Sequence, residues 1–133
     1  MTRKVDYLVI SIHEFLKIKP SGEYDRVETR QLLDRLAELI ASSDYGGILF
    51  DVRELYPTVR LTVLDIYEFV QGLVGRRTGV TNKVAVLTRR DFQFDSAQFF
   101  EICAKNRGFQ AEAFTDFEAA IDWFSVTRDL GAS

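Results

Sequence analysis

The chain has 133 residues, of which 47% are hydrophobic and 28% are charged, and its net charge is −3 at pH 7. This length suits one domain with a core large enough to fold without disulfides. The slightly acidic balance lacks the strong basic excess of nucleic-acid-binding proteins, so no nucleic-acid partner is expected. We therefore expect a single domain over residues 1–133, with a frayed tail from about residue 127.

Cysteine and histidine are almost absent from the chain. Cys103 and His13 are the only residues of their kinds. One thiol cannot form an intramolecular disulfide, and these two residues are too few for the common zinc sites or for a catalytic site with two imidazoles. The sequence therefore predicts no catalytic residues, no metal and no cofactor.

The chain also lacks the usual signals for a membrane. No stretch approaches the roughly 20 apolar residues that cross a bilayer. The apolar run near the N-terminus is interrupted by polar residues and has no small-residue cleavage site, so it is a poor signal peptide. We expect a cytoplasmic protein that is not integral to a membrane.

Two segments near the N-terminus have the composition of strands. Residues 5–12 are rich in β-branched and aromatic side chains. Residues 15–19 alternate apolar side chains with lysines, which predicts an edge strand with one solvent-exposed face. The Pro-Ser-Gly sequence at 20–22 is expected to end it. The sequence leaves open whether the two segments form one bent strand or a hairpin around His13 and Glu14.

The rest of the chain alternates helices with strands. Each helix is predicted by a capping pair, a short polar residue followed three positions later by a side chain that can return the hydrogen bond. The pairs are Asp25 with Glu28, Thr62 with Asp65, Asp95 with Gln98, and Thr115 with Glu118. Apolar runs predict buried strands at 47–52, 84–87 and 109–114. Residues 53–61 are expected to form a loop, and Gly75 and Gly108 are expected to end the second and third helices.

Strands that alternate with helices along a chain indicate a parallel sheet covered by helices. The two N-terminal strands add to this pattern. The sequence therefore predicts an α/β fold with a four- or five-stranded mixed, mostly parallel sheet that is covered by about four helices.

This layout resembles the STAS domain of bacterial anti-sigma-factor antagonists, and more closely the SpoIIAA-like group of small proteins. The resemblance lies in GGILFDVRELYPTVRLTVLDIYEF, where an apolar strand ends at Asp51 and a helix begins near Thr62. It continues in KVAVLT and FQAEAFTDFEAAIDWF. The resemblance implies a STAS-like fold and a regulatory or binding role.

One departure from that family concerns phosphorylation. In the classical antagonists an Asp-Ser-Ser-Gly sequence carries a serine that is phosphorylated at the helix start. The corresponding residues here are Val59, Arg60 and Leu61, and none of them is a serine. Thr58 lies in the same loop and is the candidate phosphoacceptor, whereas Thr62 is better explained as the helix cap.

Polar residues follow two of the predicted central strands. Ligands of open parallel sheets bind at the carboxyl ends of the strands, so the two loops are predicted to share one rim. Arginines beside a helix N-terminus would suit an anionic group. The candidate ligand-binding residues are Asp51, Arg53, Tyr56, Thr58, Arg60, Thr88, Arg89 and Arg90. The alternative is that Asp51 pairs with a neighbouring arginine and that the remaining residues are simply solvated.

Two functions fit these patterns. The leading hypothesis is a non-enzymatic regulatory or protein-interaction module that binds a protein partner or forms a homodimer. Seventeen aromatic residues support it, because a small core is not expected to hide them all. The alternative is a small carrier or sensor that binds an anionic or amphipathic ligand at the carboxyl ends of the central strands. A pre-formed apolar pocket would favour the carrier, and a flat apolar patch would favour the interaction module.

Overall fold

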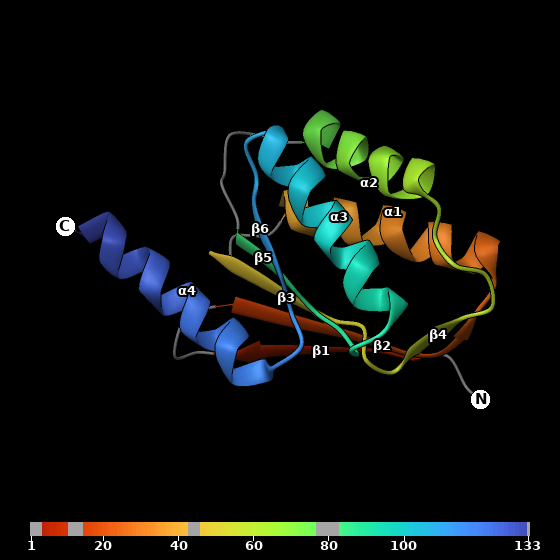
Figure 1. The fold of residues 1–133 in the computed structure, drawn as a ribbon, viewed down its shortest axis with the longest axis horizontal. Helices are drawn as coiled ribbons and strands as arrows, with labels where there is room; N and C mark the ends of the chain where they lie inside the picture. Colours follow the sequence, from red (N-terminus) through yellow and green to blue (C-terminus); the bar gives the residue numbers. More distant parts are fainter. Residues whose placement is uncertain (1–3, 11–14, 43–45, 77–82, 133) are drawn as a thin grey trace.

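The computed structural model describes residues 4–10, 15–42, 46–76 and 83–132. Helices α1, α2 and α3 cover one face of a central sheet, and α4 lies on the opposite face (Figure 1). The elements in chain order are β1 (Lys4–Ile10), β2 (Phe15–Tyr24), α1 (Arg26–Ser42), β3 (Gly47–Asp51), β4 (Leu55–Pro57), α2 (Val63–Arg76), β5 (Lys83–Leu87), α3 (Phe92–Asn106), β6 (Gln110–Phe114) and α4 (Phe117–Ala132).

The sheet is mixed and mostly parallel. Its strand order is β1–β2–β3–β5–β6, and the short strand β4 pairs with the end of β2. β1 runs antiparallel to β2, whereas the pairs β2–β3, β3–β5 and β5–β6 are parallel. The predicted fold class is therefore confirmed. This topology brings the carboxyl ends of β3 and β5 together at one edge.

β2 is an interior strand, so the prediction of an edge strand was wrong. It pairs with β1 on one side and β3 on the other, and it continues through the Pro-Ser-Gly sequence to Tyr24. Ile18 belongs to the core beneath α1, α2 and α3, whereas Lys17 and Lys19 are 19% and 30% exposed. The alternating lysines reflect an incompletely covered face of the sheet rather than its edge. The sequence left open one bent strand or a hairpin, and the antiparallel pairing of β1 with β2 shows two separate strands. His13 and Glu14 themselves lie outside the described residues.

The first two helices begin as predicted. Asp25 Oδ1 accepts from the Glu28 N–H at 2.8 Å, and Glu28 Oε1 accepts from the Asp25 N–H at 2.9 Å. Thr62 and Asp65 exchange the same two bonds at 3.1 and 2.9 Å. These reciprocal bonds satisfy backbone donors that a helix start leaves free.

The third helix begins earlier than the sequence predicted. Asp91, not Asp95, is the N-cap of α3, and its Oδ1 accepts from the Gln93 N–H at 2.8 Å. The Gln93 side chain in turn donates to the carbonyl oxygens of Val52 and Leu55 at 2.8 and 3.1 Å. The Asp91 cap is itself a local signal, and the bonds of Gln93 tie the first turn of α3 to the loop after β3.

Smaller differences occur at other boundaries. The cap of α4 is Asp116, which accepts from the Ala119 N–H at 3.1 Å, so the predicted cap at Thr115 was one residue early. The loop predicted at 53–61 contains β4, and α2 continues to Arg76 instead of stopping at Gly75. Gly108 follows α3 with a φ of 85°, the left-handed conformation expected there.

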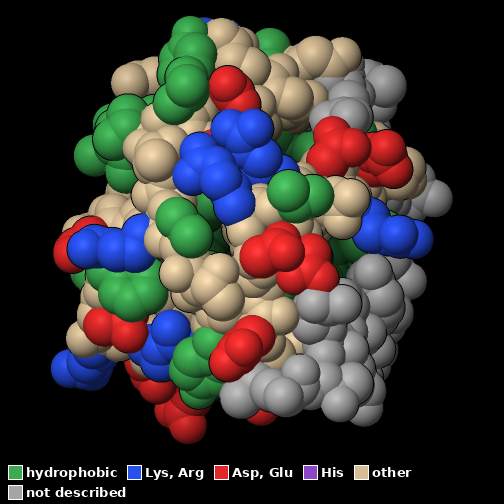
Figure 2. Space-filling view, turned by 90° about the vertical axis from the view of Figure 1, so that its right-hand side faces the viewer, with side chains coloured by type: hydrophobic (Ala, Val, Ile, Leu, Met, Phe, Trp, Pro, Cys, Tyr) green, Lys and Arg blue, Asp and Glu red, His purple; other side chains and the backbone are tan. Residues whose placement is uncertain are grey.

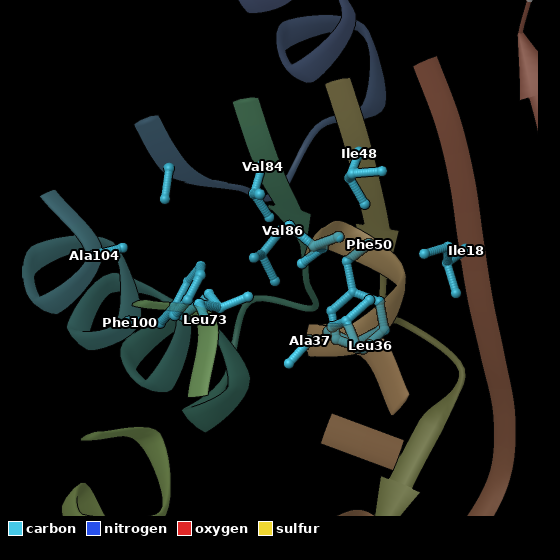
Figure 3. Packing of buried hydrophobic residues seen from close by; sticks show 14 of the residues in the cluster. Ile18, Leu36, Ala37, Ile48, Phe50, Leu73, Val84, Val86, Phe100 and Ala104 are labelled. Carbon is cyan, nitrogen blue, oxygen red and sulfur yellow. The ribbon is translucent and has the colours of Figure 1, made fainter. Parts of the chain in front are cut away.

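Two hydrophobic cores lie on opposite faces of the sheet. The larger one lies beneath α1, α2 and α3, where Phe50 of β3 lies beside Leu36 of α1, and Phe100 of α3 lies beside Leu73 of α2 (Figure 3). The smaller one lies beneath α4 and consists of Phe15, Leu49, Ala85, Leu87, Ala120 and Phe124.

Candidate functional site

The carboxyl ends of β3 and β5 form the rim that the sequence predicted. Asp51 is the register partner of Leu87, so the loops that follow these two residues start side by side. The structure brings the residues of the two loops together here. Several of them form hydrogen bonds or ion pairs with each other.

Asp51 is fully buried at the end of β3 and is held by Arg53. Arg53 Nε and Nη2 donate to its two carboxylate oxygens at 3.0 and 2.9 Å, and the Arg53 backbone N–H donates at 3.1 Å. Lys17 Nζ lies 3.8 Å away. Burial by itself would raise the pKa of Asp51, but these hydrogen bonds and charges outweigh it and lower the pKa. Arg53 is therefore committed to a carboxylate of its own chain.

Arg89 is engaged in the same way. Its Nε donates to Asp91 Oδ2 at 3.0 Å, and its Nη1 donates to the carbonyl oxygens of Arg53 and Leu55 at 2.6 and 3.1 Å. Its guanidinium also lies over the ring of Tyr56, 4.6 Å from the centroid. Arg89 therefore braces the loop between β3 and β4.

The remaining predicted residues are two threonines and two arginines. Thr88 is buried and donates its hydroxyl to the Arg89 carbonyl at 2.9 Å, whereas Thr58 is exposed and its backbone N–H donates to the Tyr24 carbonyl at 2.8 Å. Arg60 lies over the ring of Phe92 at 4.7 Å, and Arg90 is exposed. Within the described part of the chain, neither arginine has a salt-bridge partner. The anion-binding site stays a prediction, and Arg60 and Arg90 are the arginines that could still bind an anion there.

A second candidate site lies at the start of α2, where hydrophobic side chains face solvent. We call this the α2 apolar surface; its residues and exposed fractions are Val59 (48%), Val63 (65%), Leu64 (58%) and Tyr67 (43%). Tyr67 follows Leu64 by three positions and Val63 by four, and residues at these spacings are neighbours on a helix surface, so the three helical members lie together at the start of α2. Ile66, Val70 and Leu73 of the same helix are buried. The sequence predicted an exposed patch of aromatic residues; in this surface only Tyr67 is aromatic, and the other three side chains are aliphatic.

Asp65 fixes α2 against α1 beside this surface. Its Oδ1 accepts from Arg30 Nη2 at 2.8 Å and from Arg26 Nη2 at 3.2 Å. Burial would raise the pKa of Asp65, but the hydrogen bonds from Thr62 and Arg30 outweigh it and lower the pKa. Figure 2 shows the side of the molecule that carries β4 and the N-terminal ends of α1 and α2, with hydrophobic patches among basic and acidic clusters. The start of α2 is therefore held firmly while its outer face stays exposed.

A third feature is a pocket between the sheet and helices α1, α2 and α3. It has a volume of about 110 Å³, and its wall includes Leu36, Phe50, Ile66, Val86 and Phe100. Four polar residues also line it, Thr29, Thr88, Gln93 and Ser96. No sequence signal predicted the pocket, because its lining comes from elements that are far apart along the chain.

Comparisons with known proteins identify the fold. No protein-family model and no curated protein matches the chain. A DUF3478-family protein with a SpoIIAA-like fold from Shewanella loihica PV-4 matches with a TM-score of 0.54 and 14% identity, over 92% of this chain and 93% of that one. An anti-sigma factor antagonist from Mycobacterium paratuberculosis matches with a TM-score of 0.54 and 12% identity, over 92% and 95%.

The anti-sigma factor antagonist SpoIIAA in its unphosphorylated form matches with a TM-score of 0.53 and 16% identity, over 91% of this chain and 94% of that one. At such low identity the likeness shows the fold alone. The chain has the SpoIIAA-like fold, and the resemblance seen in the sequence is confirmed at that level. No helix in the described ranges is long and apolar enough to cross a membrane.

Proposed function

We propose that the chain is a non-enzymatic regulatory module that binds another protein through the α2 apolar surface. The observation that carries the proposal is the exposure of Val63 and Leu64, at 65% and 58%, in the first turn of a helix whose other face is buried. Removing apolar surface from water stabilises a complex by about 25 cal/mol per Å². Groups of exposed apolar side chains commonly mark protein-interaction sites.

The charged rim supports the non-enzymatic part of the proposal. A general acid or base works best when its pKa lies near the working pH. The pKa values of Asp51 and Asp91 are both lowered, Asp51 by its bonds with Arg53 and Asp91 by bonds from the Gln93 N–H and from Arg89. These carboxylates are suited to holding loops in place rather than to moving protons at neutral pH.

The fold gives a second line of support. Two of the structures that share it are anti-sigma factor antagonists, whose name describes action on another protein. In this chain the α2 apolar surface includes Val59, one of the residues that take the place of the missing serine. A regulatory role for this chain would therefore rest on apolar contact at the helix start rather than on a phosphoserine there.

A photo-crosslinking amino acid at Val63, introduced in the cells that make the protein, tests this proposal. We expect a discrete protein adduct, and we expect Leu64→Glu to abolish it. The matched control places the same amino acid at Asp122, an exposed position on α4. Equal adducts at both positions, or none at either, would overturn the proposal. An adduct of twice the chain's mass would identify the partner as a second copy, and light scattering of the purified protein would then show a homodimer.

A further inference from the structure

We propose that the pocket beneath α1, α2 and α3 binds a small, uncharged, largely apolar molecule of about the size of benzene or phenol. This site goes beyond the proposed function, which uses only the outer face of α2. It also differs from the anionic site predicted at the rim, because its walls carry no charged side chain.

The walls set the chemical class of the ligand. The sheet contributes Phe50 and Val86, and the three helices contribute Leu36, Ile66 and Phe100. Charged groups are very costly to bury without a partner, so a charged ligand would be rejected. An apolar ligand would instead gain contacts with the aliphatic and aromatic side chains of these walls.

The volume sets the size of the ligand. Protein cores rarely keep voids much larger than a water molecule. A dry apolar cavity of about 150 Å³ is known to bind benzene. The pocket here, at about 110 Å³, is somewhat smaller, and wall residues such as Leu32 and Val86 each keep 8% of their surface accessible. A single six-membered ring is therefore the size that suits the pocket, and because the pocket is not fully enclosed, one small substituent can extend toward its open side.

One polar group in the wall is available to such a ligand. Thr29 donates its hydroxyl to the Asp25 carbonyl at 2.8 Å, and Thr88 and Gln93 are engaged as described above. Ser96 is half-buried on α3, and within the described residues its hydroxyl has no hydrogen-bond partner. A ligand hydroxyl could bond to Ser96 while its ring fills the apolar volume, so phenol should bind better than benzene.

Titration of the full chain with benzene and with phenol, followed by methyl NMR, tests the proposal. We expect saturable shifts at the methyl groups of Leu36, Ile66 and Val86, and none at Leu49 or Leu87 in the other core. Ser96→Ala should weaken phenol binding by roughly threefold to tenfold, in line with the loss of one hydrogen bond, and leave benzene binding unchanged. Absence of saturable shifts with both ligands would overturn the proposal.

Filling the pocket provides the matched control. Ala97 is buried and lines the pocket, so Ala97→Leu should abolish binding of both ligands. Ala119→Leu makes the same change on α4, outside the pocket, and should leave binding unchanged. If Ala97→Leu does not fold, Ser96→Leu fills the same volume from the adjacent position. Ligand shifts that persist in a folded filled variant would place the binding elsewhere and contradict the proposal.

Discussion

The two faces of the sheet are packed to different degrees. Beneath α4, the side chains of Phe15, Leu49, Ala85, Leu87 and Ala120 have no exposed surface, and Phe15 stacks on Phe124 with ring centroids 4.8 Å apart. Beneath α1, α2 and α3, several core residues keep 6–8% of their surface accessible around the pocket.

The number of helices that pack on each face accounts for this difference. On the α4 face, small residues let the helix approach closely; a Cβ atom at Gly47 would lie 2.5 Å from the Phe124 ring. On the other face, three helices must pack against the sheet and against each other at the same time. A pocket remains where they meet the sheet. We infer that the α4 face chiefly stabilises the fold, whereas the three-helix face carries both proposed binding sites.

Among the tests of this comparison, truncation of a core phenylalanine should have the largest effect on the free energy of unfolding. Phe15→Ala opens a cavity at a fully buried position and should lower the free energy of unfolding by about 4 kcal/mol. Phe100→Ala, beside the existing pocket, should cost less, about 3 kcal/mol. Urea denaturation followed by circular dichroism measures both. A larger loss for Phe100→Ala would contradict the assignment of the tighter core to the α4 face.

Loss of the buried carboxylate at the rim comes next. Asp51→Asn leaves Arg53 without its ion pair and should destabilise the fold by about 3 kcal/mol at pH 7. Because the pKa of Asp51 is lowered in the folded state, its contribution is complete above the unfolded value of about 3.9 and is lost as the pH falls through the folded value.

The difference between wild type and Asp51→Asn should therefore shrink in acid, which urea denaturation between pH 7 and pH 2 would show. Glu118→Gln on the exposed side of α4 is the control and should stay within about 0.5 kcal/mol of wild type. A constant difference across the whole pH range would show that burial of the amide, not the ion pair, causes the loss.

A direct comparison of packing adds volume to each face. Gly47→Ala should destabilise the fold by about 1.5 kcal/mol, because contact with Phe124 outweighs the conformational gain of alanine in a strand. Ala97→Leu adds more volume but extends into the pocket, so its effect should stay within about 1 kcal/mol. Thermal unfolding of the two variants measures both losses of stability. A larger loss for Ala97→Leu than for Gly47→Ala would contradict the assignment of the tighter packing to the α4 face.

The smallest expected effect concerns the start of α2. Thr62→Ala removes the side-chain cap of the helix and should cost about 1 kcal/mol. Thr58→Ala should change stability by less than about 0.5 kcal/mol, because the described bond of Thr58 is made by its backbone. Urea denaturation distinguishes the two. Equal losses would mean that the Thr58 side chain also supports the loop.

The sequence by itself determined the order of the elements, the mostly parallel sheet and the starts of α1 and α2. These features depend on side-chain periodicity and on hydrogen bonds that span three or four residues, such as those between Thr62 and Asp65. Such local interactions are the same in nearly any fold that contains these segments. The resemblance to the SpoIIAA-like group rested on the same order of elements.

Only the tertiary structure decided which residues of the candidate site are held by bonds within the chain. Arg89 binds the carbonyl of Arg53, 36 positions away, and Gln93 binds that of Val52, 41 positions away. These bonds engage a predicted ligand-binding arginine and tie the first turn of α3 to the loop after β3. The pocket likewise depends on how far three helices can approach one sheet. Contacts over such separations follow from the packing of the whole domain, so no local pattern in the sequence could specify them.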